Sequence, residues 1–381
     1  MKSVFALLFC LLSIGGQAQY WIQKASFAGV GRHRAVGCAT ENKGYLGLGH
    51  VNGTGVNYAY QDWWEYDPSS DSWSQRANYP VANYGATSFV VNGHPCVGGG
   101  AALDGQFYQF NPLENTWTAI APCPFFNPGD TQGFSVNNKG YVYVAQQMAA
   151  YDPSSNSWSL TANPPVTFGS WTCAFTIEGS GYVKAGTKLY EYKPIHNTWT
   201  QRADFPGTST GGSSGFSILQ RGFVTCGYVG GLATVTSQVW SFFPGTNSWQ
   251  LELEFPGISR RFPVAFAIHN RGYFGTGTNG INLNDFWQYN PTLNTSGLPE
   301  NSDVQCRIFP NPTNDFLQVE LPSEYASGLI GEVRNLNGQV IQQVELLPGI
   351  THIDLSQVSS GTYFLTIPYG DKVLNKMFKI W

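Results

Sequence analysis

The sequence predicts an all-β chain made of repeated four-stranded units. The composition points that way: 15% of the 381 residues are aromatic, only 12% are charged, and there are 44 glycines but only 3 methionines. Aromatic residues favour strands and glycines favour turns, so this composition argues against helix bundles and coiled coils. The net charge of −4, without a run of Lys or Arg, also argues against nucleic-acid binding through a basic patch.

The first 18 residues have the pattern of a secretory signal peptide. Lys2 gives a positively charged start, residues 4–12 form an apolar run that is too short to span a bilayer, and residues 16–18 follow the small-x-small pattern of a cleavage site. A buried N-terminal helix is the alternative explanation. We expect the mature chain to begin at Gln19, and no later segment is long and apolar enough to predict a transmembrane helix.

Six cysteines remain after the predicted cleavage. They are Cys38, Cys96, Cys123, Cys173, Cys226 and Cys306. Export permits disulfides, but the spacing is wide and no CxxC pair occurs. We therefore predict buried small hydrophobic side chains, with a disulfide framework or a metal site as the alternatives.

Six segments share a motif in which an aromatic residue is followed by Pro two places later and usually by Trp seven places later. The aromatic residues are Tyr66, Phe110, Tyr151, Tyr192, Phe242 and Tyr289. The first five motifs end at Trp73, Trp117, Trp158, Trp199 and Trp249, which are 44, 41, 41 and 50 residues apart, whereas the sixth has Ser296 in that place. Turn-forming residues separate the two aromatic positions, so each motif predicts a β-hairpin.

A second hairpin is predicted upstream of each motif. A glycine closes a short polar turn there, and an aromatic residue follows it in every copy except the one with His94. The glycines are Gly44, Gly93, Gly140, Gly181, Gly222 and Gly272. Two hairpins supply four antiparallel strands, and six such units with a period of about 40–50 residues predict a six-bladed β-propeller.

The N-terminal segment of the mature chain is expected to close the ring. Residues 21–27 begin with Trp21 and have the pattern of an outer strand, but no hairpin precedes them. The sixth motif, at Tyr289, lacks its own Trp. We therefore predict that residues 21–27 pair with the strand ending at Tyr289, which would leave no open sheet edge at the seam.

The predicted propeller, residues 19–296, resembles the kelch-repeat family. Kelch repeats carry an aromatic residue and a Trp at about this separation, after a glycine doublet. Here the doublet is complete only at Gly98-Gly99, is degraded in other repeats and has no counterpart in the third. The resemblance implies a six-bladed propeller, but propellers host many unrelated functions, so it implies no single activity.

The C-terminal part of the chain predicts a separate small β-sandwich. Residues 297–303 are polar and read as a linker, and residues 304–381 contain alternating apolar positions and hairpin turns. Residues 309–312 (FPNP), a later Asn-Gly turn, residues 361–365 (GTYFL) and a basic terminus resemble, in this order, the C-terminal sorting domain of the type IX secretion system. A terminal adhesion module is the alternative.

The sorting-domain resemblance implies a location and a partner. The partner is the type IX secretion machinery of Gram-negative, Bacteroidota-type bacteria. The cargo of that system crosses the outer membrane, loses this domain, and is released or attached to the cell surface.

Candidate binding residues lie in the loops that join hairpins and blades. These loops vary in length and composition, whereas the turns inside the hairpins are short and regular. The candidates are Arg32, His33, Arg34, His50, Tyr84, Trp171, Arg260 and Arg261. Ring closure would make blades six and one neighbours, so the arginines could converge on a carboxylate, a phosphate or an acidic sugar. Trp171 could stack on a sugar. The alternatives are solvated loops, inter-blade ion pairs and packing.

The sequence gives no clear catalytic set. A kelch-type copper oxidase needs two His ligands and a Tyr, but only His33 and His50 fall on the loop face. A Ser/His/Asp triad is not indicated, and no P-loop or EF-hand motif stands out. We expect no cofactor and no metal. A sialic-acid mutarotase-like activity is known among six-bladed kelch propellers, and the arginines are compatible with it. The first hypothesis is a secreted module that binds a glycan or a protein. The second is a carbohydrate-active enzyme of the mutarotase or epimerase type, ahead of a galactose-oxidase-like one.

Overall fold

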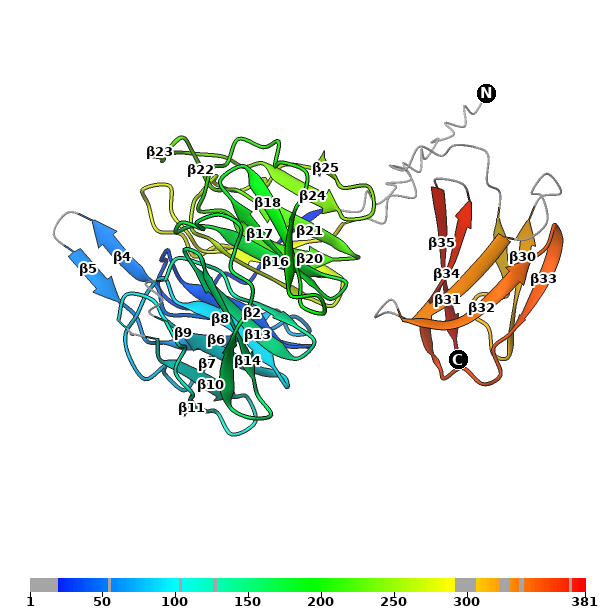
Figure 1. The fold of residues 1–381 in the computed structure, drawn as a ribbon, viewed down its shortest axis with the longest axis horizontal. Helices are drawn as coiled ribbons and strands as arrows, with labels where there is room; N and C mark the ends of the chain where they lie inside the picture. Colours follow the sequence, from blue (N-terminus) through cyan, green and yellow to red (C-terminus); the bar gives the residue numbers. More distant parts are fainter. Residues whose placement is uncertain are drawn as a thin grey trace, which may run out of the picture. The chain divides into compact units, whose positions relative to one another are not determined.

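The computed structural model describes residues 20–53, 56–102, 105–125, 129–291, 306–321, 329–335, 339–369 and 372–381. The predicted signal peptide, residues 1–18, and the predicted linker, residues 297–303, lie outside these ranges. The chain divides into two compact units, Met1–Thr292 and Leu293–Trp381. Every regular element in the described part of both units is a β-strand (Figure 1).

The first unit contains six four-stranded antiparallel sheets, which we number 1 to 6 in chain order. Sheet 1 consists of β2 (Val36–Ala39), β3 (Gly44–Gly47), β6 (Trp63–Asp67) and β7 (Ser72–Arg76). Sheet 2 consists of β8 (Thr87–Val91), β9 (His94–Gly98), β10 (Phe107–Asn111) and β11 (Thr116–Ile120). Sheet 3 consists of β12 (Phe134–Val136), β13 (Lys139–Val144), β14 (Gln147–Asp152) and β15 (Ser157–Leu160).

Sheets 4 to 6 follow the same plan. Sheet 4 consists of β16 (Cys173–Ile177), β17 (Ser180–Ala185), β18 (Lys188–Lys193) and β19 (Thr198–Gln201). Sheet 5 consists of β20 (Ser214–Ile218), β21 (Arg221–Thr225), β24 (Val239–Phe243) and β25 (Ser248–Leu251). Sheet 6 consists of β26 (Val264–Ile268), β27 (Arg271–Gly275), β28 (Phe286–Tyr289) and β1 (Trp21–Lys24). Sheets 1 and 5 carry extra hairpins, β4 (His50–Gly53) with β5 (Val56–Ala59) and β22 (Tyr228–Val229) with β23 (Gly231–Val235).

The first strands of the six sheets pack side by side around a common axis. In order, β2 contacts β8, β8 contacts β12, and the series continues through β16, β20 and β26 back to β2. This arrangement is propeller-like. It places the connections that precede these inner strands at one end of the axis.

The N-terminal strand completes sheet 6. Trp21 pairs with Tyr289 and Lys24 pairs with Phe286, so β1 forms the outer strand beside β28. This is the pairing that the sequence predicts for residues 21–27. Sheet 6 is therefore built from both ends of the first unit.

The repeated tryptophans link each sheet to the one before it. The indole N–H of each Trp donates to a main-chain carbonyl that follows the outer strand of the preceding sheet, at 2.7–3.4 Å. The pairs are Trp73 with Ala25, Trp117 with Ala77, Trp158 with Ala121, Trp199 with Ala162, Trp249 with Ala203 and Trp21 with Leu253. In the first five pairs, the N–H of the same alanine donates to an Asp or Asn two residues before the Trp.

Five of the repeated glycines make room for a phenylalanine of the neighbouring sheet. A Cβ atom at Gly44, Gly140, Gly181, Gly222 or Gly272 would lie only 2.0–2.4 Å from such a ring. Gly93 is the exception, because nothing lies within 4 Å of it and its φ is +73°. Gly93 closes the Asn92–Gly93 turn between β8 and β9, as the sequence predicts, but it does not share this packing role. Sheet 1 has Cys38 where the other sheets have Phe, so sheet 2 has no ring to accommodate and carries Pro95 in the equivalent place.

The second unit is a small sandwich of two sheets. One contains β29 (Arg307–Phe309), β30 (Phe316–Leu321) and β33 (Gly349–Asp354), and the other contains β32 (Val340–Leu346), β31 (Leu329–Asn335), β34 (Gly361–Tyr369) and β35 (Lys372–Ile380). Leu317, Val333, Leu365 and Phe378 are fully buried between them. Residues 311–313 run beside the end of β35, where the Thr313 N–H donates to the Lys379 carbonyl.

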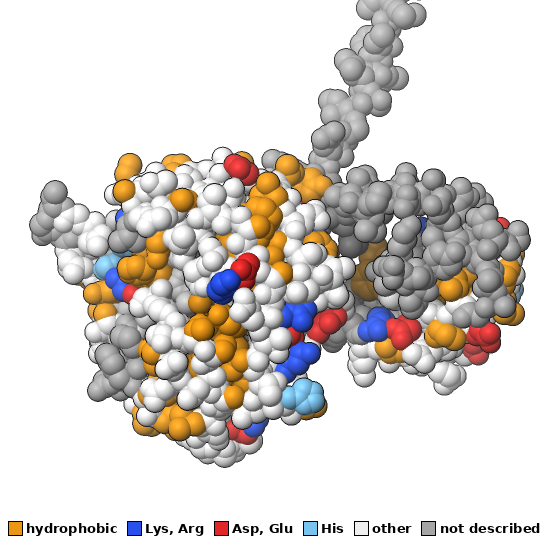
Figure 2. Space-filling view, turned by 45° about the horizontal axis from the view of Figure 1, so that its top comes forward, with side chains coloured by type: hydrophobic (Ala, Val, Ile, Leu, Met, Phe, Trp, Pro, Cys, Tyr) orange, Lys and Arg blue, Asp and Glu red, His pale blue; other side chains and the backbone are white. Residues whose placement is uncertain are grey.

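The cysteines of the described residues are buried and form no disulfide with one another, as predicted. They are Cys38, Cys96, Cys123, Cys173, Cys226 and Cys306. The surface of the first unit carries few charges, and on the face seen in Figure 2 several Lys or Arg side chains lie beside Asp or Glu side chains.

Candidate functional site

A cavity opens at the end of the axis where the connections reach the inner strands. Its volume is about 140 Å³, and each of the six sheets contributes to its wall. The outermost lining residues, one per sheet, are Arg34, Gly85, Asp130, Trp171, Gly212 and Phe262. We call these six residues the mouth. A second cavity of about 330 Å³ lies further along the same inner strands and shares Gly37 and Ser88 with the first.

The backbone of the mouth forms a chain of hydrogen bonds from sheet to sheet. The N–H of Gly85 donates to the Arg34 carbonyl, and the same link is repeated by Asp130, Trp171, Gly212 and Phe262, each to the preceding member, at 2.5–2.9 Å. All six residues have positive φ angles, between 53° and 67°. Glycine adopts this left-handed conformation freely, whereas other residues lose about 1–2 kcal/mol. Four of the six are not glycine, so their side chains are present at a conformational cost.

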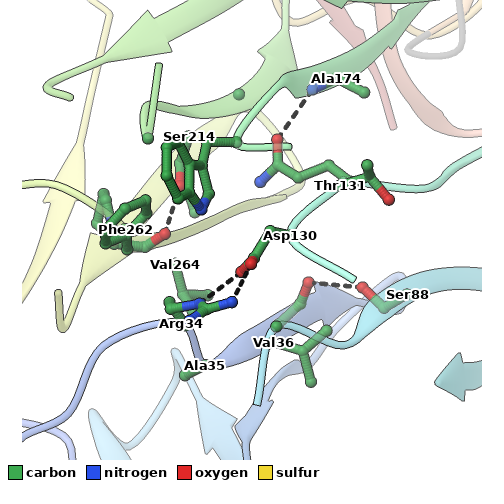
Figure 3. Close-up of a pocket in the computed structure, with 18 of the residues that line it drawn as sticks. Arg34, Ala35, Val36, Ser88, Asp130, Thr131, Ala174, Ser214, Phe262 and Val264 are labelled. Carbon is green, nitrogen blue, oxygen red and sulfur yellow. Dashed lines mark hydrogen bonds and ion pairs between the residues drawn. The ribbon is translucent and has the colours of Figure 1, made fainter. Parts of the chain in front are cut away.

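Arg34 and Asp130 form an ion pair across the mouth (Figure 3). The Arg34 Nε donates to Asp130 Oδ1 at 2.6 Å, and Nη2 donates to Oδ2. The pair passes over Gly85, where a Cβ atom would lie 2.7 Å from Asp130 Oδ1. The Arg34 guanidinium also lies 4.6 Å from the centre of the Tyr84 ring. Burial raises the pKa of Asp130, and the Arg34 charge opposes that rise.

The opposite side of the mouth is aromatic. The Trp171 ring lies 5.6 Å from Tyr228 and 5.7 Å from Phe262, measured between centroids. Tyr228 belongs to the extra hairpin of sheet 5 and covers Gly211, where a Cβ would approach its hydroxyl to 2.4 Å. The Trp171 indole nitrogen is buried, and its interaction with the Asp130 carboxyl group lowers the pKa of that group. The mouth therefore has a charged side that is internally paired and an aromatic side.

Two buried histidines stand beside the charged side. The His50 ring stacks on Tyr84 at 4.0 Å and contacts the His33 ring at 4.3 Å. His33 Nδ1 lies 2.7 Å from the Asn282 side-chain oxygen. Burial lowers the pKa of both histidines, to about 4 for His50, and the Arg34 charge lowers both further. Neutral imidazoles therefore pack this side of the mouth.

Arg32 and Arg260 are not placed to contact a ligand, which corrects the expectation from sequence. Both are 0% exposed. Arg32 pairs with Asp62 and donates to the Leu48 carbonyl at 3.0 Å. Arg260 does the same with Asp285 and the Thr276 carbonyl, at 2.9 Å. The repetition of one environment in sheets 1 and 6 identifies these arginines as part of the scaffold.

The other candidates from sequence lie at or beside the mouth. Arg34 and Trp171 line the cavity, whereas His33, His50 and Tyr84 stack behind Arg34. The Arg261 guanidinium lies 5.9 Å from the Phe262 ring centre, and its charge lowers the pKa of His33.

Sequence reasoning missed three residues of this site, Asp130, Phe262 and Tyr228. Alignment of the six connections by the start of each inner strand would have placed five of the six mouth residues, all except Asp130, in one column. Arg34, Gly85, Trp171, Gly212 and Phe262 each stand two residues before such a strand.

Two further features of the described residues bear on function. They contain no group of three or more His, Cys, Asp and Glu side chains that could hold a metal ion. They also contain no helix that is long and apolar enough to cross a membrane.

Comparison with known proteins indicates where the chain is exported and which fold it resembles. Residues 307–380 match the family described as "Secretion system C-terminal sorting domain". This domain directs secretion through the type IX system to the cell surface or the extracellular space. No curated protein matches the chain. A solved structure entitled "Structure of YjhT" is similar with a TM-score of 0.60 and 15% identity, over 70% of this chain and 97% of that one. At this identity, the similarity concerns the fold alone.

Proposed function

We propose that this chain is a kelch-type propeller of six blades that binds a ligand at the mouth. Its sorting domain directs the chain to type IX secretion. Sheets 1 to 6 are the blades, and β1 closes the ring. The signal peptide is residues 1–18, the propeller residues 19–296, the linker residues 297–303 and the sorting domain residues 304–381. The ligand is an extracellular glycan or protein, and the propeller binds it without catalysis.

The backbone of the mouth carries this proposal. The fold requires a left-handed residue at the same place in every sheet, and Gly85 and Gly212 meet that requirement without strain. Arg34, Asp130, Trp171 and Phe262 have the same conformation with large side chains. Strained residues that cluster around a cavity support a functional role for their side chains. These four side chains are therefore the proposed contacts for the ligand.

The binding test uses the mature chain, residues 19–381, on glycan and protein arrays. We expect a specific ligand whose binding is lost in Trp171→Gly, a variant that retains an allowed backbone at this position. Leu113→Gly serves as the control, because Leu113 is 96% exposed in a hairpin turn of sheet 2. If the ligand binds Trp171→Gly as well as wild type, the proposed site is wrong.

A carbohydrate-active enzyme of the mutarotase or epimerase type is the second candidate. The observation in its favour is Asp130, a mostly buried carboxyl group in the wall of the cavity. Ring opening of a sugar needs a general acid and base, and a carboxyl group in a cavity could act as one. Mutarotation measured on the mature chain, and its loss in Asp130→Asn, would favour this candidate over simple binding.

A further inference from the structure

We propose that the mouth accepts one neutral sugar ring, the end of an uncharged glycan, and discriminates against acidic sugars. This inference rests on the proposed binding function and specifies the ligand of the same site. It also differs from the expectation that a cluster of arginines would favour an acidic ligand.

Among the described residues, Arg34 and Asp130 are the only charged ones in the wall of the mouth cavity. They are paired through two hydrogen bonds, so this part of the wall has no net charge. The described wall of the deeper cavity contains no charged residue. A carboxylate entering the mouth would meet Asp130 beside the guanidinium that already balances it. A neutral hydroxyl pair, in contrast, can donate to Asp130 and accept from Arg34 without a charge penalty.

The size of the cavity fits a single ring. An engineered protein cavity of about 150 Å³ accommodates benzene, a six-membered ring. The mouth cavity, at about 140 Å³, is similar. The Arg34 side chain remains 24% exposed, so the cavity opens to solvent and the rest of a glycan could extend outward.

The aromatic side supplies the remaining features of a sugar site. Trp171 and Phe262 line the cavity opposite the ion pair and offer apolar rings to the C–H face of a sugar. The buried indole N–H of Trp171 belongs to the same wall and could donate to a sugar oxygen. One wall with paired polar groups and one wall with aromatic rings together match an uncharged, hydroxyl-rich ring.

The test compares neutral and acidic probes on the mature chain. Calorimetric titration uses the methyl glycosides of glucose, galactose, mannose and N-acetylglucosamine, and then glucuronic acid, galacturonic acid and N-acetylneuraminic acid. We expect at least one neutral glycoside to bind at least ten-fold more tightly than every acidic sugar. Tighter binding of an acidic sugar would overturn the inference but leave the proposed function intact, because the mouth would still be a binding site.

A charge variant tests the preference for neutral over acidic sugars in a way that does not depend on which sugars are chosen. Asp130→Asn leaves the Arg34 charge unbalanced, so we expect the preference to move at least ten-fold toward the acidic sugars. The double variant Arg34→Gln with Asp130→Asn restores a neutral wall, and the acidic preference should disappear. Asp152→Asn is the matched control, since it breaks the Lys139–Asp152 pair in a hairpin turn of the same sheet. Circular dichroism establishes that each variant is folded.

The remaining outcomes are also decisive. An unchanged preference in folded Asp130→Asn would overturn the inference, as would an absence of binding by all seven probes. The array experiment with Trp171→Gly then decides separately whether the mouth binds another ligand. Failure of the inference is thereby distinguishable from failure of the proposed function.

Discussion

Arg32 and Arg34 are two residues apart, yet they belong to different parts of the molecule. Arg32 is fully buried, and Arg260 repeats its ion pair and carbonyl contact in sheet 6. Arg34 is partly exposed, and its partner Asp130 comes from a different sheet. A feature that recurs from sheet to sheet supports the scaffold, whereas a feature that occurs once marks the place where function departs from the repeat.

The same contrast separates the tryptophans. Trp21, Trp73, Trp117, Trp158, Trp199 and Trp249 all donate to the preceding sheet in the same way. Trp171 has no such contact and lines the mouth. The comparison yields four predictions, all tested by stability, and the first and last also by ligand binding.

The largest effect is expected for the repeated arginine. Arg260→Met leaves Asp285 partly buried without its partner, which should lower the free energy of unfolding by about 3–5 kcal/mol. Urea denaturation of the mature chain measures the change. Adding Asp285→Asn should recover part of the loss. Arg34→Met also leaves a mostly buried carboxyl group, Asp130, without its partner, so a comparable cost is expected, but only this variant should abolish ligand binding. Loss of ligand binding in folded Arg260→Met would contradict the division into scaffold and site.

The fold could be predicted largely because its determinants repeat. The Trp spacing indicates the outer strands, and the missing sixth Trp indicates that Trp21 completes sheet 6. The different packing of Gly93 could not be predicted, because the sequence does not show that Cys38 removes the ring that a glycine would accommodate.

The site was less predictable because consecutive loop residues point in different directions. Sequence spacing does not reveal that Arg32 turns into the sheets, His33 packs beside His50, and Arg34 reaches the axis. Asp130 was missed because it stands four residues before β12, whereas the other mouth residues stand two before their strands. The shared left-handed conformation groups Asp130 with the other five mouth residues.

The second largest effect concerns pH. Above pH 6.5, His50 is neutral in both the folded and the unfolded chain and adds nothing to the pH dependence. Below that value the unfolded chain binds the proton, but the folded chain, with a His50 pKa of about 4, does not. Stability should therefore fall between pH 6.5 and 4, by up to about 3 kcal/mol.

His50→Phe tests this, because a phenyl ring retains the stack on Tyr84 and does not titrate. Urea midpoints at pH 7 and pH 4.5 should differ less in this variant than in wild type. His269→Asn is the control, since His269 is exposed and its left-handed backbone tolerates Asn. If the acid sensitivity of His50→Phe equals that of wild type, the buried histidine pair is not its source.

A smaller effect is expected for one inter-sheet link. Trp158→Phe removes the 2.7 Å hydrogen bond to the Ala121 carbonyl and part of the packing against Phe89. The expected loss is about 1–2 kcal/mol, since one hydrogen bond contributes about 1 kcal/mol. Chemical denaturation followed by circular dichroism measures it. Trp381→Phe, at a side chain that is 76% exposed, should have no effect. A loss in both variants would indicate a general effect of replacing Trp.

The smallest effect tests the strain at the mouth itself. Trp171→Gly and Trp171→Ala remove the same contacts with Tyr228 and Phe262, but only glycine is relaxed at φ +67°. The glycine variant should therefore be more stable than the alanine variant by about 1 kcal/mol, the reverse of the usual order in strands and helices. Both variants should lose ligand binding to the same extent. Greater stability of the alanine variant would mean that the Trp171 backbone is not strained, and the conformational cost would no longer support a functional role for its side chain.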